Sequence, residues 1–196
     1  MANWCTTWYT VCSNNQEMLQ TIFNAINKCN KMKEPLTSYS APNWTGNIFK
    51  ELGIEAETGR SFWSEAILKN GELKFTESSA WNRDDAIVLL QEHYCDNGTT
   101  DYDDFIIYFC SEEFGCGIYE TNDEDGEYYP ERFCWIGEDG WEYFNCFEDL
   151  EIAVRDFLEV DTDFDDVDAI NEALEKAEEE HGSQHVYEIE INELLS

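Results

Sequence analysis

The chain has 196 residues and is strongly acidic, with 44 acidic against 11 basic residues and a formal net charge of −33. Hydrophobic residues make up 42% of it and aromatic residues 15%, which is enough apolar surface to offset the loss of chain entropy and argues against disorder. No apolar run approaches the roughly 18 residues of a membrane span, and the opening residues lack the layout of a signal peptide. We therefore expect a cytoplasmic protein of one domain with extensions.

The acidic residues are concentrated in the later part of the chain. Residues 1–74 carry seven acids and seven bases, whereas residues 75–196 carry 37 acids and four bases. Adaptation to salt, or a general need for solubility, would spread the acids along the whole chain. The concentration therefore favours a local role for the negative charge.

The first residues predict a strand followed by a helix. Residues 3–12 are rich in Trp, Thr, Tyr and Val, which is a strand composition. Ser13 or Asn14 is expected to cap a helix whose apolar residues recur at helical spacing. Residues 31–60 contain several Pro and Gly residues and predict an irregular connection, with a short helix near 48–52.

A hairpin and a second helix are expected next. The strand-like runs 61–68 and 72–78 flank Asn70-Gly71, the commonest two-residue hairpin turn, because both positions tolerate positive φ. Asn82 is expected to cap the helix that follows, with Asp84 and Asp85 in a first turn where the helix dipole favours carboxylates.

The rest of the chain predicts more strands and then helices. Gly-containing turns separate four strand candidates, which we expect to form a meander: 104–113, 116–121, 127–136 and 141–147. Residues 148–159 and 164–180 have helical patterns, and residues 185–194 alternate like a closing strand.

The order strand, helix, two strands, helix, strand is that of the ferredoxin-like split βαβ arrangement. We therefore predict an α+β fold with an antiparallel sheet of this kind, extended by hairpins and by an acidic helical C-terminal region. The predicted domains are a ferredoxin-like domain at 1–147, and an acidic helical extension with a closing strand at 148–196 that packs on the same domain.

Four segments also carry a family resemblance: the opening MANWC, the strand SFWSEAI, the returning strand FTESSAW and the stretch IIYFCSEEFGCGIYETNDEDG. Together they resemble the YubB ferredoxin-like family found on plasmids and phages, over roughly residues 1–135. The resemblance implies a fold and a mobile-element setting, and it implies no activity. The acidic helices after Glu148 lie outside it, so we expect them to be this protein's own specialisation.

The residues that usually carry catalysis form no recognisable motif. A serine or cysteine nucleophile needs a histidine base, and the histidines are His93, His181 and His185. His181 and His185 have a spacing that can bind zinc on a helix, but Gly182 between them favours a helix end. None of the eight cysteines forms a C-x-x-C pair, so we interpret them as reduced, buried, small hydrophobic residues. We expect no enzyme activity, metal or cofactor.

A calcium loop is the main alternative for the acidic segment. The window from Asp161 to Glu172 has carboxylates near the spacing of an EF-hand loop. Asp166, however, replaces the glycine that permits the sharp turn of such a loop. A solvated acidic helix N-terminus explains the same residues, and both interpretations stay open here.

The last helix has an acidic stripe beside an apolar one. Like charges at three- and four-residue spacing weaken a helix by a few tenths of a kcal/mol per pair, so the stripe is locally unfavourable and points to a function, although a merely solvated face is the alternative. The preceding helix adds a second acidic row. The predicted partner-binding residues are Asp161, Asp163, Asp165, Asp168, Glu172, Glu175 and Glu179, with Glu148, Asp149, Glu151 and Asp156 on the preceding helix.

A surface of this charge repels phosphates, so we expect no direct contact with nucleic acid and a basic partner instead. The leading hypothesis is a non-enzymatic inhibitor that mimics nucleic acid. It would bind the basic nucleic-acid-binding surface of a host defence protein, such as a nuclease or a CRISPR effector, like anti-restriction and anti-CRISPR proteins. The alternatives are a structural or regulatory module, a weak calcium-binding protein and a metal-dependent enzyme.

Overall fold

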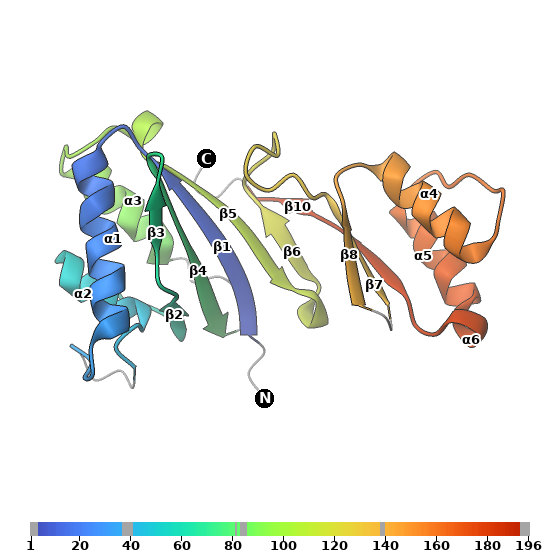
Figure 1. Cartoon of the computed structure of the whole chain (residues 1–196), viewed down its shortest axis with the longest axis horizontal. Coiled ribbons are helices and arrows are strands. Elements are labelled where there is room, and N and C mark those ends of the chain that lie inside the picture. Colours follow the sequence, from blue (N-terminus) through green and yellow to red (C-terminus); the bar gives the residue numbers. More distant parts are fainter. Residues whose placement is uncertain (1–3, 37–40, 81, 83–85, 138–139, 193–196) are drawn as a thin grey trace. The chain divides into compact units, whose positions relative to one another are not determined.

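The computed structural model of the chain describes residues 4–36, 41–80, 82, 86–137 and 140–192 (Figure 1). Contacts divide the chain into a first unit, Met1–Asp123 with Asn192–Ser196, and a second unit, Glu124–Ile191. Each unit has a hydrophobic cluster of its own. The described residues form a mixed α+β structure with two sheets, which confirms the predicted α+β class.

The first unit contains an antiparallel sheet in which β1 is central. Neighbouring strands follow the order β6-β5-β1-β4-β2, and β3 also pairs with β4. Its strands are β1 (Trp4–Cys12), β2 (Ser61–Trp63), β3 (Ile67–Lys69), β4 (Glu72–Ala80), β5 (Ile106–Glu113) and β6 (Ile118–Thr121). Its helices are α1 (Gln16–Lys31), α2 (Thr45–Leu52) and α3 (Ala86–Asp96), with 3₁₀ helices at Tyr102–Asp104 and Phe114–Cys116.

The core of the first unit lies on the helical side of this sheet. Tyr9 of β1 pairs directly with Phe75 of β4 and with Phe109 of β5, and directly paired residues share a sheet face. All three rings are buried in one cluster with side chains of α1, α2 and α3, such as Leu19 and Leu90. The period-two pattern of β1 thus sets which of its residues face the helices.

The cap of α1 differs from the prediction by one or two residues. Asn15 is the N-cap, and its side chain accepts a hydrogen bond from the backbone N–H of Met18 at 3.1 Å. Ser13 Oγ donates instead to Asp104 at 3.0 Å, and the backbone N–H of Asn14 donates to the same carboxylate at 3.1 Å. These two residues are therefore held by a distant acid, and the next residue caps the helix.

The predicted hairpin at Asn70-Gly71 is confirmed, with φ values of 55° and 85° at the two turn residues. The strand expected over 61–68, however, is broken into β2 and β3. The side chain of Asn27 accepts a hydrogen bond from the Ala66 N–H and donates one to the Ala66 carbonyl, so this backbone does not pair with β4. The predicted first turn with Asp84 and Asp85 lies outside the described residues.

The predicted meander is wrong, because its four strands form two hairpins in different sheets. β5 pairs with β6, whereas β7 (Phe133–Gly137) pairs with β8 (Gly140–Phe144) and with β9 (His185–Glu188). The second sheet has the order β8-β7-β9. For this reason the boundary between the two units lies between Asp123 and Glu124, whereas the sequence predicted a domain boundary after residue 147.

The helices of the second unit pack on one face of its sheet. They are α4 (Phe147–Leu158), α5 (Val167–Lys176) and the short α6 (Glu178–His181), and the two-residue strand β10 (Glu190–Ile191) follows β9. The closing strand predicted over 185–194 is interrupted at Ile189, whose N–H donates to the Arg132 carbonyl, and its last two residues lie outside the described residues. The buried cluster joins the sheet to both long helices: Phe133, Trp135, Leu150, Val154, Ile170, Leu174 and Val186.

We expect the two cores to respond separately to cavity-forming substitutions. Leu174→Ala removes most of a side chain that is 1% exposed in the second cluster, which costs about 2–5 kcal/mol of stability. Hydrogen exchange followed by mass spectrometry should show lost protection in β7 and β9 and retained protection in β1 and β4. Leu90→Ala, in the first cluster, should give the opposite pattern. Equal loss in both units from either variant would contradict two separate cores.

Candidate acidic interface

Most of the net charge belongs to the second unit. Its 68 residues carry 24 acids and three bases, a formal net charge of −21. The first unit carries 20 acids and eight bases over 128 residues, a net of −12. The charge per residue is therefore several times higher in the smaller unit.

The bases of the second unit are engaged within that unit. Arg132 donates to the backbone carbonyls of Tyr129 and Glu124, each at 2.9 Å. Arg155 forms an ion pair with Asp163 at 2.6 Å, and Lys176 forms one with Glu172 at 3.4 Å. Arg155 and Lys176 thus each pair with a carboxylate, and Arg132 has backbone oxygens among its partners. Three bases cannot cancel the field of 24 acids.

Helix α4 presents acids on the side that faces away from the core. Leu150 and Val154 are fully buried against the sheet, whereas Glu148, Asp149 and Asp156 are exposed. The first two stand in the first turn, where the helix dipole favours a carboxylate. Because one face of α4 is buried against the sheet, these three predicted partner-binding residues point to solvent.

The predicted helix over 164–180 is wrong as a continuous element. The Asp166 side chain accepts from the Ala169 N–H at 2.8 Å and caps α5, so the helix begins at Val167. The backbone of Asp166 is extended, which leaves Asp165 outside the helix. The helix ends at Lys176, and Glu179 belongs to α6. The predicted acidic stripe is therefore divided over a loop and two helices.

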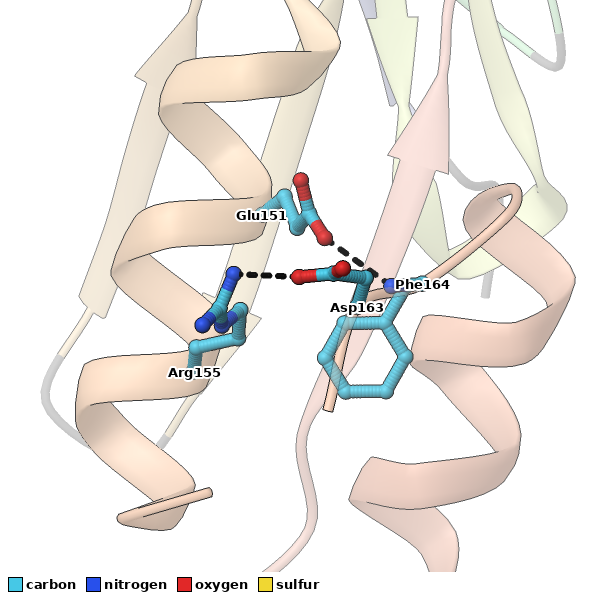
Figure 2. A network of polar contacts seen from close by, with 4 residues as sticks. All are labelled: Glu151, Arg155, Asp163 and Phe164. Atoms are coloured by element: carbon cyan, nitrogen blue, oxygen red, sulfur yellow. Dashed lines mark hydrogen bonds and ion pairs between the residues drawn. The ribbon is translucent and has the colours of Figure 1, made fainter. Parts of the chain in front are cut away.

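Two predicted partner-binding residues hold the connection between α4 and α5 (Figure 2). The carboxylate of Glu151 accepts a hydrogen bond from the Phe164 N–H at 2.9 Å. One turn further along α4, Arg155 pairs with Asp163 of the same connection. Glu151 is half-buried, whereas Asp163 remains exposed. These two acids thus have a structural role, and only Asp163 also contributes to the surface.

Three predicted residues do come together, in a surface hollow of about 620 Å³ that we call the acidic hollow. Its carboxylates are Asp168, Glu172 and Glu175 of α5, joined by Glu178 of α6. Sequence reasoning missed Glu178, although it stands three residues after Glu175. Asp161 and Asp165, in the preceding loop, and Glu148, Asp149 and Asp156 of α4 are exposed elsewhere on this unit.

One wall of the acidic hollow is fixed by Asn171, which the sequence analysis also missed. Its side-chain amide donates to the Val186 carbonyl at 2.9 Å and accepts from the Val186 N–H at 2.7 Å. Val186 belongs to β9, which stands at the end of the sheet order. The side chain therefore satisfies backbone groups of an edge strand and ties α5 to it.

In the described part of the chain, no group of three or more His, Cys, Asp or Glu side chains is arranged to hold a metal ion. Within the calcium-like window, Asp163 pairs with Arg155 and Asp166 caps α5, so both carboxylates have other contacts. The rings of His181 and His185 pack against Phe157 and Tyr187, respectively, at centroid distances of 4.8 and 4.5 Å.

The cysteines fit their predicted role in part. Cys5, Cys29, Cys110 and Cys134 are buried, as expected, but Cys116 and Cys146 are exposed. Burial raises the pKa of the Cys5 thiol to about 11 and that of the Cys29 thiol to about 11. Both thiols therefore stay protonated at neutral pH, the form that is a poor nucleophile.

Comparison of the chain with protein-family models, curated proteins and solved structures returned no match. Among the described residues, no helix combines the length and the apolar character needed to cross a membrane. The role of the acidic surface therefore has to be inferred from its own charge and geometry.

The contact between Glu151 and the α4–α5 connection gives a testable prediction. Glu151→Ala should lower the free energy of unfolding by about 1 kcal/mol, because the Phe164 N–H loses a charged acceptor. Asp156→Ala removes the same charge from an exposed position on the same helix and should change stability by less than about 0.5 kcal/mol. Chemical denaturation of both variants measures the difference. Equal effects would mean that the Glu151 contact contributes nothing.

Proposed function

We propose that this protein is a non-enzymatic inhibitor that binds the basic nucleic-acid-binding surface of a host defence protein, a nuclease or a CRISPR effector. The observation that carries the proposal is the net charge of −21 on a 68-residue unit with its own core. The described carboxylates of that unit are exposed, except for Glu131 and Glu151, which are half-buried. The charge is thus directed to solvent, where a partner can meet it.

The sign and spacing of the charge both favour nucleic-acid mimicry. An anionic surface repels phosphates and attracts the Lys and Arg residues with which proteins bind them. On α5 the exposed acids recur at steps of four and three residues, from Asp168 through Glu172 to Glu175. With a rise of about 1.5 Å per residue they stand roughly 5 Å apart along the axis, the same order as the ~3.4 Å of helix axis per phosphate on one strand of duplex DNA.

The ferredoxin-like assignment of the first unit belongs to the same proposal. Its support is the strand order β5-β1-β4-β2 with antiparallel neighbours, together with helices α1 and α3 on one side of the sheet. That order is the one expected of a split βαβ unit in which β2 is the second strand, β4 the third and β5 the fourth. With the resemblance to the YubB family, it favours a mobile-element origin, in which an inhibitor of host defence has a use.

The proposal predicts binding that depends on salt and on the acidic hollow. Neutralising its four acids (Asp168→Asn, Glu172→Gln, Glu175→Gln and Glu178→Gln) should weaken binding on the order of tenfold, because the partner's cations lose their counterparts. Immobilised protein should retain nucleic-acid-binding proteins from a host lysate at low salt and release them at high salt. Each retained protein is then purified, and its binding is measured directly and in competition with nucleic acid.

A matched variant separates a local effect from a change in total charge. Glu34→Gln, Glu55→Gln, Glu57→Gln and Glu65→Gln together remove four exposed charges from the first unit. This control should bind nearly as well as the unchanged protein. An equal loss of partner binding in both variants would mean that only the total charge matters, as in a module whose charge only maintains solubility. A partner that binds nucleic acid and this protein simultaneously would exclude mimicry.

A further inference from the structure

The second unit has another hollow, next to the β7–β8 hairpin and α4, with a volume of about 370 Å³. Its aromatic lining is supplied by Trp135, Trp141 and Phe157, and its charged lining residue is Glu142. We call these four residues the aromatic pocket. None of them belongs to the acidic hollow or to the residues predicted to bind a partner. The two hollows therefore differ in chemistry, one being lined with carboxylates and the other with rings and a single carboxylate.

Two rings of the aromatic pocket, those of Trp135 and Phe157, have defined contacts. Trp135 packs edge to face against Phe157, with ring centroids 5.0 Å apart. The indole N–H of Trp135 donates to the side-chain carbonyl of Gln184 at 3.0 Å, and the Gln184 amide donates in turn to the His181 carbonyl at 3.1 Å. By contrast, Trp141 is 62% exposed. The pocket thus combines a fixed ring inside with an accessible ring at the surface.

Glycine at position 137 makes this arrangement possible. A Cβ atom at Gly137 would lie 2.1 Å from the side-chain oxygen of Gln184, closer than atoms can approach. A side chain at residue 137 would therefore force Gln184 to shift from this position. The absence of a side chain at residue 137 thus leaves room for the Gln184 amide beside the indole of Trp135.

Glu142 is a charged residue at a strand position whose neighbours on the same sheet face are aromatic. It pairs directly with Trp135 across β7 and β8, so its side chain lies on the sheet face that carries the helices. The next such pair on this face is Phe133 with Phe144, and both of these rings pack in the core. Among the described residues, the Glu142 carboxylate forms no hydrogen bond or ion pair. Because Glu142 is exposed, this carboxylate beside aromatic rings is available to a cation from outside.

We infer that the aromatic pocket binds the guanidinium group of an arginine side chain from the basic partner, an inference that rests on the proposed function. A guanidinium is planar and can stack on an indole face while donating two hydrogen bonds to one carboxylate. Trp141 and Glu142 are adjacent in the chain and supply both groups. Arginine is abundant on surfaces that bind nucleic acid, so the partner class already proposed carries this ligand.

The test uses the full chain and N-acetyl-arginine N-methylamide as the probe, with the citrulline analogue as a neutral control of nearly the same shape. The indole N–H signals of Trp135 and Trp141 are followed by NMR. We expect both to shift saturably with the arginine probe and to remain unchanged with the citrulline probe. No saturable shift, or an equal shift with both probes, would overturn the inference. So would a response confined to α5 and α6.

Two substitutions locate the site. Trp141→Ala should weaken binding of the arginine probe by about three- to thirtyfold, the range expected for a lost cation–π contact. Glu142→Gln should weaken it at least as much, whereas Glu148→Gln, which removes the same charge from exposed α4, should leave it nearly unchanged. Trp141 and Glu142 are exposed, so both variants should fold, and hydrogen exchange in β7 verifies this. Equal effects of Glu142→Gln and Glu148→Gln would mean that the probe is attracted by the overall negative charge and not by the aromatic pocket.

The outcomes for this inference and for the proposed function are separable. If the pocket variants bind the partner normally while the acidic hollow variant does not, the inference falls and the proposed function stands. If the arginine probe binds in the pocket but no nucleic-acid-binding partner is retained, the pocket stands and the proposed function falls.

Discussion

The packing of α4 and α5 on one face of the second sheet is the constraint on which the acidic surface depends. Leu150, Val154, Ile170 and Leu174 are all but completely buried there. Full burial of such a side chain contributes about 1.5–3 kcal/mol, whereas each like-charge pair at helical spacing costs a few tenths of a kcal/mol. The core therefore outweighs the repulsion along α5, and the helix can carry its acids outward. Without this core, a segment of such charge would favour disorder.

Two kinds of recognition can coexist on such a unit. In the proposed function, the acidic hollow would attract a basic partner through a field that reaches about 10 Å at moderate salt and depends on ionic strength. The aromatic pocket, as inferred, would act at contact distance and select the chemistry of one side chain. Trp and Arg are typical of the few residues that carry most of the energy of an interface. Long-range attraction and a local anchor would together give both fast association and specificity.

Charged side chains in this protein also serve structure, and this limits what an acidic sequence pattern can reveal. Glu151 accepts the Phe164 N–H, Asp166 caps α5, and Asp104 binds the residues before α1. In the sequence these carboxylates look like their neighbours. Each contact joins residues whose proximity follows from how the chain returns on itself, so composition could not separate them from the acids of the surface.

The sequence by itself determined the elements whose cause is local. The turn at Asn70-Gly71, the α+β class and the alternation of β1 follow from backbone preference and periodicity, which act over a few residues. Only the tertiary structure decided that β7 pairs with β9 in a second sheet and does not continue the predicted meander. It also decided that the side chain of Asn27 interrupts the strand before the hairpin. It also gathered Asp168, Glu172, Glu175 and Glu178 into one hollow and placed Glu142 beside Trp135. Those outcomes depend on which distant backbone and apolar groups find each other, a choice that no short window of sequence contains.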